Sequence, residues 1–179
     1  MKKSASLIVT ILFTIVVDAQ DAHNLNSKGF RQAKKGNYTK AIQLFTRALQ
    51  LDDYFADAWY NRALAYSRLK EYSKAIADYT NAIKLRSHFK MAYNNRGADR
   101  NELKDHAGAI ADYTKAIELD SNYARAWYNR GVVQMNLIEY EKAVSDFTKA
   151  IELEPGYKEA FINREIAKRK MMEGGRRTK

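Results

Sequence analysis

Cysteine is absent from this sequence of 179 residues, proline occurs once and glycine eight times. Without a thiol the chain can form no disulfide, thiolate metal site or cysteine nucleophile. So few helix-breaking residues beside 46% hydrophobic residues favour a helical protein. Acidic residues are also scarce, at 21 against 31 basic ones, so the formal net charge is +10. Such a charge attracts anionic partners but says nothing about the fold.

A long apolar run lies close to the start of the sequence. It extends from Leu7 to Val17, follows two lysines and precedes a small-residue exit at Ala19. This three-part arrangement is typical of a secretory signal peptide. As a helix the run would span about 16 Å, roughly half of a bilayer's hydrocarbon core. We therefore expect residues 1–19 to be a signal peptide cleaved near Ala19, and the protein to be exported to the periplasm or secreted. The alternative is an uncleaved N-terminal anchor.

Similar residues recur along the rest of the chain at a constant spacing. This spacing, which we call the repeat interval, is the number of positions from Trp59 to Tyr93. Large, small and aromatic residues each form columns in this register. The columns include Trp59, Tyr93, Trp127 and Phe161; Gly29, Ala63, Gly97 and Gly131; Ala41, Ala75, Ala109 and Ala143; Phe45, Tyr79, Tyr113 and Phe147; and Ala48, Ala82, Ala116 and Ala150. So many columns in one register indicate a tandem repeat.

Each repeat reads as two amphipathic helices. In the second repeat Trp59, Ala63 and Tyr66 lie on one helical face, and residues 75–83 carry a second apolar stripe after a break. Small residues at the recurring positions permit close packing of the two helices.

Residues that can begin a helix precede the first helix of several repeats. Asp53, Ser87 and Ser121 can each accept a hydrogen bond from a free N–H group, and Pro155 suits a first helical turn. The sequence therefore predicts these residues at helix N-termini.

This arrangement resembles the tetratricopeptide-repeat family, in which a large residue, a Gly or Ala, an Ala, an aromatic residue, an Ala and a Pro stand at fixed offsets. The match is best at Trp127, Gly131, Ala143, Phe147, Ala150 and Pro155. The resemblance implies an all-α fold, a right-handed α-solenoid of antiparallel helix pairs. With the signal peptide, it suggests an exported bacterial-type member of the family. We expect four tandem repeats over residues 22–157, divided into 22–55, 56–89, 90–123 and 124–157.

The end of the stack is marked by Glu165, which occupies the column of small residues in a fifth, incomplete unit. A partner helix packed closely there would bury the carboxylate at a high cost. The sequence therefore predicts a capping helix over residues 158–172 and a basic disordered tail over residues 173–179.

Polar residues form further columns at the same interval. They are Asn61, Asn95, Asn129 and Asn163; Arg62, Arg96, Arg130 and Arg164; and Asp78, Asp112 and Asp146. An arginine and an aspartate in successive repeats predict ion pairs between repeats, which would fix their register. Each pair should stabilise the fold only slightly if it is exposed.

Candidate residues for catalysis are not grouped. His23, His88 and His106 fall at different places in the repeat and so predict neither a metal site nor a shared general base. A glycine-rich phosphate loop and a nucleophile elbow are also lacking. We expect no enzymatic activity, no cofactor and no metal.

In tetratricopeptide-repeat proteins the first helices line a concave groove that accepts a peptide or a protein. The resemblance carries this role to Asn26, Phe30, Tyr60, Asn61, Leu64, Arg68, Asn94, Asn95, Arg125, Tyr128 and Asn129. Asn can hold a peptide amide through its donor and its acceptor, and Tyr offers a large contact area. The alternative is that these Tyr and Asn side chains pack between neighbouring first helices. Both roles can hold at once.

Chaperone-binding members of the family use a carboxylate clamp of five lysine, asparagine and basic residues. No frame of this chain supplies more than two of the five, so we predict that it does not capture the acidic C-terminus of a chaperone. The alternative function is charge-driven association with an anionic envelope surface, a membrane or nucleic acid. It would use the basic C-terminal residues Lys168, Arg169, Lys170, Arg176 and Arg177. Export makes nucleic acid the less accessible partner.

Overall fold

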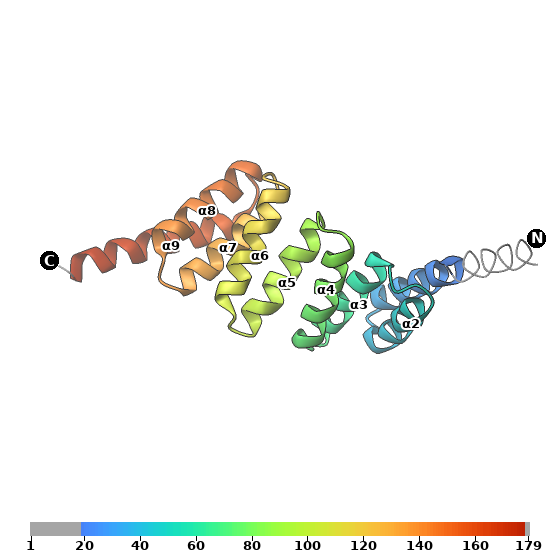
Figure 1. Ribbon diagram of the computed structural model, residues 1–179. Helices are drawn as coiled ribbons and strands as arrows, with labels where there is room; N and C mark the ends of the chain where they lie inside the picture. Colours follow the sequence, from blue (N-terminus) through green and yellow to red (C-terminus); the bar gives the residue numbers. More distant parts are fainter. Residues whose placement is uncertain (1–18, 178–179) are drawn as a thin grey trace, which may run out of the picture. The chain divides into compact units, whose positions relative to one another are not determined.

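A computed structural model describes residues 19–177, and the regular secondary structure in that range is entirely helical. The helices are one over residues 19–34, then α2 (Tyr38–Leu51), α3 (Ala56–Arg68), α4 (Tyr72–Leu85), α5 (Lys90–Glu102), α6 (His106–Leu119), α7 (Ala124–Asn136), α8 (Tyr140–Leu153) and α9 (Lys158–Arg177) (Figure 1). Short connections join them. The predicted all-α architecture of antiparallel helix pairs is therefore confirmed.

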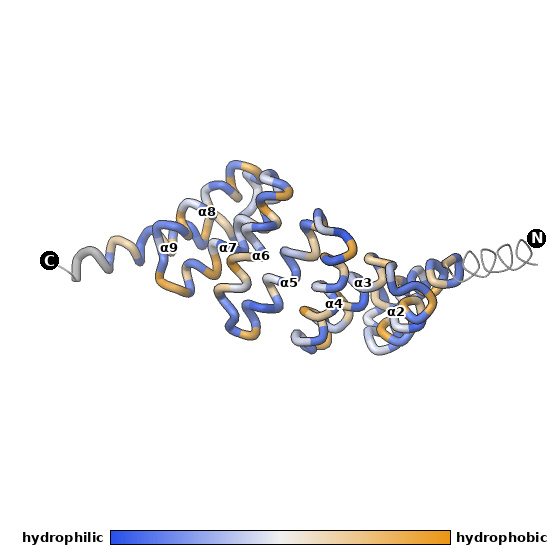
Figure 2. The backbone as a smooth tube through the Cα atoms, viewed as in Figure 1, coloured by the Kyte–Doolittle hydropathy of each residue, from blue (hydrophilic) through white to orange (hydrophobic). Residues whose placement is uncertain are grey.

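The described residues form two compact units, which divide between Ser87 and His88. In the first unit α3 packs against both α2 and α4, and in the second each helix from α5 to α9 packs against its neighbour. Hydrophobic and hydrophilic residues alternate around the helices in short stretches (Figure 2), as expected for helices with one buried face. Stacking of successive helix pairs is the α-solenoid arrangement within each unit.

The core of each unit is built from the recurring small and aromatic residues. A Cβ atom added to Gly29 would approach the Phe45 ring within 2.6 Å, and one added to Gly131 would approach the Phe147 ring within 2.8 Å. Both rings are fully buried. The small residue of the first helix therefore lets the ring of the second helix lie directly on its backbone, which explains why the two columns keep the same register.

The connection between the two helices of a repeat places one residue in the left-handed region of backbone space. This residue is Gly36, with φ of 80°, then Lys70, Lys104 and Ile138, with φ of 60°, 66° and 66°. In the last of these turns the Ile138 N–H donates to the Met135 carbonyl at 3.1 Å. The conformation costs a residue with a Cβ atom about 1–2 kcal/mol, but it satisfies carbonyl groups at the helix end.

The helix starts differ from the prediction. The N-cap residues of α3, α5 and α7 are Phe55, Phe89 and Tyr123, and none of them makes a side-chain capping hydrogen bond. The predicted positions Asp53, Ser87, Ser121 and Pro155 all lie inside the connections before these helices and α9. The Trp59 indole N–H donates to the Asp53 carbonyl at 2.8 Å, and that of Trp127 to the Ser121 carbonyl at 2.9 Å. Tryptophan side chains thus bond to the turns before α3 and α7. A polar side-chain cap is found instead at α6, where Asp105 Oδ1 accepts from the Gly108 N–H at 2.9 Å.

The last helix is longer than predicted. α9 extends to Arg177, so residues 173–177 are helical and the prediction of a disordered tail from residue 173 is wrong for them. No proline interrupts this stretch, and the Lys170 ammonium lies 3.6 Å from the Glu173 carboxylate one turn on, which favours the helix. Residues 178–179 lie outside the described range. Lys168 and Arg164 hold the pKa of the exposed Glu165 carboxyl below its usual range.

The predicted signal peptide covers residues 1–19, of which residues 1–18 lie outside the described part of the chain. Between residues 19 and 177, no helix is both long enough and apolar enough to cross a membrane.

Candidate functional site

Predicted groove residues of neighbouring repeats are hydrogen-bonded to one another. Asn61 Nδ2 donates to Asn26 Oδ1 at 3.0 Å in the first unit, and Asn129 Nδ2 donates to Asn94 Oδ1 at 3.0 Å in the second. Each donor stands 35 residues after its acceptor. We call this series of bonds the asparagine ladder; it uses amide groups that would otherwise face a ligand.

Asn94 is the clearest correction among the predicted groove residues. Its side chain is 2% exposed, and its amide also donates to Asn95 Oδ1 at 3.1 Å. A peptide lying on the surface cannot reach it, so the expectation that Asn94 contacts a ligand is wrong. Its Oδ1 atom accepts from Asn129 of the next repeat, and its Nδ2 group donates within its own repeat.

Tyr128 is also engaged in packing. Its hydroxyl accepts a hydrogen bond from Asn163 Nδ2 at 3.0 Å, which extends the asparagine ladder, and its ring centroid lies 4.8 Å from that of Tyr157. Burial raises the pKa of the Tyr128 hydroxyl and raises that of Tyr157 to about 12. The ring centroid of Tyr60 lies 5.7 Å from that of Tyr79. Tyr128 therefore takes the alternative role, packing between the neighbouring first helices α7 and α9, whereas the Tyr79 ring beside Tyr60 belongs to the second helix of the same repeat.

The arginine–aspartate pairs form within repeats and not between them, so that prediction is wrong. Arg62 Nε lies 2.7 Å from Asp78 Oδ2, and Arg130 Nε lies 2.7 Å from Asp146 Oδ2. The side chains of the second pair are 17% and 5% exposed, so these are largely buried contacts between the two helices of one repeat. Burial raises the pKa of Asp78 although Arg62 opposes the shift. The preceding repeat supplies a neutral partner instead, since Arg62 Nη1 donates to Thr46 Oγ1 at 3.0 Å.

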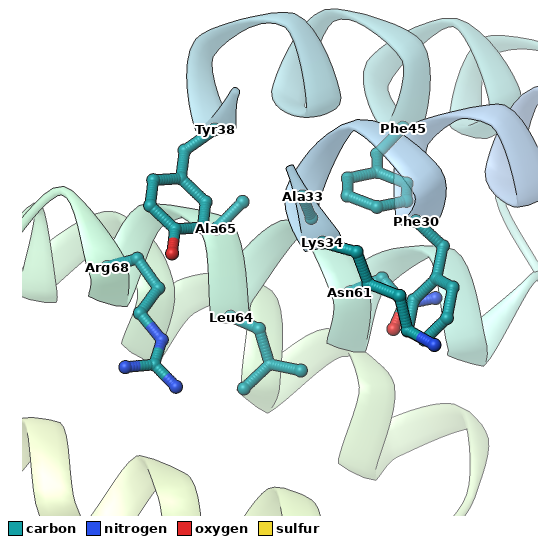
Figure 3. A pocket seen from close by; sticks show the side chains of 9 residues that line it. All are labelled: Phe30, Ala33, Lys34, Tyr38, Phe45, Asn61, Leu64, Ala65 and Arg68. Carbon is teal, nitrogen blue, oxygen red and sulfur yellow. The ribbon is translucent and has the colours of Figure 1, made fainter. Parts of the chain in front are cut away.

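A cavity in the first unit brings several predicted groove residues together. Its volume is about 350 Å³, and it is lined by Phe30, Ala33, Lys34, Tyr38, Phe45, Asn61, Leu64, Ala65 and Arg68. These side chains come from the helix over residues 19–34, from α2 and from α3. In Figure 3, Leu64 lies between Arg68 on one side and Lys34 and Phe30 on the other.

The cavity combines apolar and cationic surface. Phe30 is 46% exposed and Leu64 is half-buried, while the fully buried Phe45 forms part of the lining. The Lys34 ammonium lies 4.9 Å from the Phe30 ring centroid. Among the residues that the structure describes, neither Lys34 nor Arg68 has a carboxylate within ion-pair distance. Two cations without a charged partner thus border the apolar lining of the cavity, Lys34 beside the exposed Phe30 ring and Arg68 on the far side of Leu64 (Figure 3).

Sequence reasoning found Phe30, Asn61, Leu64 and Arg68 but missed Lys34 and Tyr38. Lys34 stands four residues after Phe30 on the same helical face, as Arg68 does after Leu64, so helical spacing could have identified it. Tyr38 begins α2, and its position in the sequence gives no sign that its ring reaches the surface of the first helices.

The remaining predicted residues do not join this cavity. Arg125 is exposed on α7, Asn129 is half-buried, and Asn95 receives the hydrogen bond from Asn94. In the described part of the chain, no three His, Asp or Glu side chains are grouped so that they could hold a metal ion.

Models of the repeat family match most of the helical region. The tetratricopeptide-repeat model matches residues 56–89 and 124–157, and a second model of the same repeat matches residues 31–70 and 100–137. RNA polymerase II-associated protein 3 of Mus musculus is 42% identical over 57 residues, which are 32% of this chain and 9% of that protein. The chain spans less than half the length of the curated relatives that it matches.

Solved structures show the same architecture. The first repeat domain of Spaghetti (RPAP3), bound to the HSP90 peptide SRMEEVD, superposes with a TM-score of 0.65 at 34% identity, over 66% of this chain and 94% of that one. The MamA protein has a TM-score of 0.77 over 88% of this chain and 82% of its own, at 22% identity, which is a likeness of fold alone. The periodic columns, the stacked helix pairs and these matches together show that the chain belongs to the tetratricopeptide-repeat family of protein-interaction scaffolds.

Proposed function

We propose that this protein is a non-catalytic adaptor that binds a segment of a partner protein in the cavity of its first unit. The observation that carries the proposal is the exposed apolar surface of Phe30 and Leu64 between Lys34 and Arg68. Exposed apolar surface with a polar rim is typical of interaction sites. The two cations favour a segment in which a carboxylate stands close to an apolar side chain.

The dimensions of the cavity suit an extended segment. A volume of about 350 Å³ lies at the small end of ligand pockets and suits one or two side chains better than a folded surface. Asn61 donates one amide hydrogen to Asn26, which leaves its carbonyl oxygen able to accept a bond from a peptide N–H. The partner would thus place an apolar side chain between Phe30 and Leu64 and its backbone beside Asn61.

The peptide seen on the Spaghetti domain supports a peptide ligand for this related chain. Our prediction against an acidic chaperone C-terminus nevertheless stands. In the first frame of the clamp, Asn26 takes the place of the lysine and Phe30 that of the first asparagine. Asn26 is also bonded to Asn61. Phe30 makes this site more apolar than a clamp for two carboxylates.

The proposed location is outside the cytoplasm, in the periplasm or the medium. It is supported by the apolar run from Leu7 to Val17 and the small-residue exit at Ala19. Retention of this segment as an anchor is the alternative.

The alternative function, binding of anionic surfaces by the basic C-terminal residues, has less support. Lys168 donates to Glu165 at 3.1 Å and Lys170 lies 3.6 Å from Glu173, so these two cations already have anionic partners. Arg169 is exposed. The side chains of Arg176 and Arg177 lie outside those described.

The experiment that tests the proposal begins with a photo-crosslinking amino acid at position 64 in the native cell, followed by identification of the attached peptide. The synthetic peptide is then titrated against the purified full chain and against a Phe30→Ala, Leu64→Ala variant. Binding should weaken at least about 30-fold, because a central apolar anchor contributes about 2 kcal/mol or more.

A Leu51→Ala, Tyr54→Ala variant is the matched control, since it removes one leucine and one aromatic ring, 40% and 79% exposed, in the same unit. It should bind like the unmodified chain. Equal affinity of the cavity variant and this control would rule out the cavity as the binding site.

A further inference from the structure

The side of α9 that a second helix would cover is open. α9 takes the place of a first helix in a fifth repeat, so its residues can be compared with those of α7 one repeat interval earlier. Gly131 of α7 lies against the Phe147 ring of α8, and Gln134 is buried. The equivalent residues of α9 are Glu165 and Lys168, whose side chains are 46% and 37% exposed. Within the described residues no further helix covers them.

Apolar side chains stand at both ends of this open side. Phe161 and Met172 are 53% and 59% exposed. In the order Phe161, Glu165, Lys168 and Met172, the residues are spaced by four, three and four positions, which places them on one side of a helix. We call these four residues the α9 stripe. α9 has 20 residues against 13 in α7, and this extra length supplies Met172.

A cavity adjoins the first residue of the α9 stripe. Its volume is about 380 Å³, and the residues that line it are Pro155, Gly156, Tyr157, Lys158, Phe161 and Ile162. Ile162 is itself 56% exposed. Exposed apolar surface beside charged residues is typical of a contact with another protein. A flexible apolar side chain such as that of methionine is suited to fill an irregular cavity of this kind.

The order of side chains in the α9 stripe determines which helix fits it. The stripe reads apolar, acidic, basic and apolar. A helix that covers it must therefore bring a cation opposite Glu165, an anion opposite Lys168 and apolar side chains at both ends. α9 itself meets these conditions when it runs in the opposite direction, because the spacing and the charge order are then complementary. In the parallel direction each charge would face its own kind, which is repulsive.

We propose that the protein forms a homodimer in which α9 of one copy packs antiparallel against α9 of a second copy. Phe161 then contacts Met172 of the second copy, where the methionine side chain enters the cavity beside the ring. Glu165 contacts Lys168 of the second copy. A two-fold axis repeats both contacts, so the dimer is closed and does not grow further.

The Glu165 carboxylate has room for this additional partner. Within one chain its Oε1 atom accepts hydrogen bonds from Arg164 and Lys168, both at 3.1 Å. Its Oε2 atom accepts none from the described residues, and the side chain is 46% exposed. A second ammonium group at Oε2 offsets the cost of bringing a helix close to this carboxylate, which an uncharged helix would not do.

Sedimentation equilibrium of the purified full chain over a concentration series tests the proposal. The mean mass should rise from that of one copy to that of two. In a Glu165→Lys variant both cross-copy pairs become contacts between lysines, and in a Lys168→Glu variant they become contacts between glutamates. Each change should raise the dissociation constant of the dimer about 25-fold, at roughly fivefold for each of the two contacts.

An equimolar mixture of the two variants tests the direction of the pairing. In a mixed dimer the lysines of one variant face the glutamates of the other, so the affinity should return close to that of the unmodified chain. Such a recovery also shows that both variants are folded. A mixture that associates no better than either variant alone would overturn the antiparallel pairing.

Glu152→Lys is the matched control, because it makes the same change in an exposed pair of the same spacing on α8, where Lys149 Nζ lies 3.0 Å from Glu152 Oε2. It should leave the dimer unchanged. Three results would each contradict the proposal: an equal loss of affinity in this control, an unmodified chain that stays monomeric at every concentration, and assembly that continues beyond the dimer.

Discussion

The left-handed residue of each helix–helix turn shows how a repeat imposes its geometry on an unsuitable side chain. Gly36 adopts φ of 80° without strain, but Ile138 adopts φ of 66° at the equivalent place with a branched Cβ atom. The Ile138 side chain is 70% exposed, so its packing contributes little free energy to offset the cost of this backbone conformation. The conformation is set by hydrogen bonds of the helix end, not by the residue that carries it.

We therefore predict that Ile138→Gly stabilises the protein by about 1 kcal/mol, because glycine adopts the left-handed conformation freely. Urea unfolding followed by circular dichroism measures the change. Ile138→Ala is the control, because it shortens the side chain but keeps the Cβ atom, and its stability should stay near that of the unmodified chain. A glycine variant less stable than the alanine variant would contradict the prediction.

For single residues, the sequence predicts the local backbone role only where that role requires one residue type. Gly36 marks its own turn, whereas Lys70 and Ile138 carry no such signal. Asp53 and Ser121 were predicted as caps from residue type, but the structure uses their backbone carbonyls, which bond to tryptophan side chains. A carbonyl is common to every residue, so residue type could not reveal this role.

At the scale of helices, a buried ion pair joins the two helices of a repeat. The pair of Arg130 and Asp146 connects α7 to α8, and Arg130 also donates to Thr114 on α6 at 3.0 Å. One guanidinium group thus bonds to its own repeat by charge and to the preceding repeat by a neutral hydrogen bond.

Removing only the cation should leave the Asp146 carboxylate buried without a partner. We expect Arg130→Met to lower the free energy of unfolding by about 3 kcal/mol, and the double variant Arg130→Met, Asp146→Leu to recover most of that loss. Chemical denaturation of the single and double variants measures both effects. Lys142→Met, which breaks an exposed pair with Glu139, should change stability by no more than about 0.5 kcal/mol. A loss that small for Arg130→Met would refute the account.

Helices and their register could be predicted because the columns of small and aromatic residues report directly on packing. The direction of the arginine–aspartate pairs could not, since a constant repeat interval is compatible with partners in the same or the adjacent repeat. Part of the cavity lining was among the predicted groove residues. The repeat interval places Phe30 and Leu64 at equivalent positions, and helical spacing places Arg68 one turn after Leu64 on α3. Neither spacing reveals that Asn94 is buried.

At the scale of the whole molecule, the described packing begins shortly after the predicted cleavage site. Ala22 is the first fully buried residue that the structure describes. Cleavage after Ala19 would therefore leave the packed part of the first helix intact. This placement is compatible with the proposed signal peptide.

We predict that protein recovered from its native cell begins at Gln20, because the segment before it has the three parts of a cleavable signal. Intact-mass spectrometry of the purified protein reads the N-terminus directly. A protein produced without an export pathway serves as the control and should retain the preceding residues. A native mass that still includes residues 1–19 would favour the anchored alternative.

The asparagine ladder has a consequence for the history of such a chain. Its donor is an Asn Nδ2 group in each described bond, and its acceptor, 35 residues earlier, is an oxygen of either Asn or Tyr. Excision of residues 124–157 would bring Asn163 to the register of Asn129, opposite the acceptor of Asn94. Unequal recombination could thus delete or duplicate a whole repeat and leave every junction amide with a partner. Repeat number is then free to drift in a lineage, while the bond that joins successive repeats is inherited unchanged.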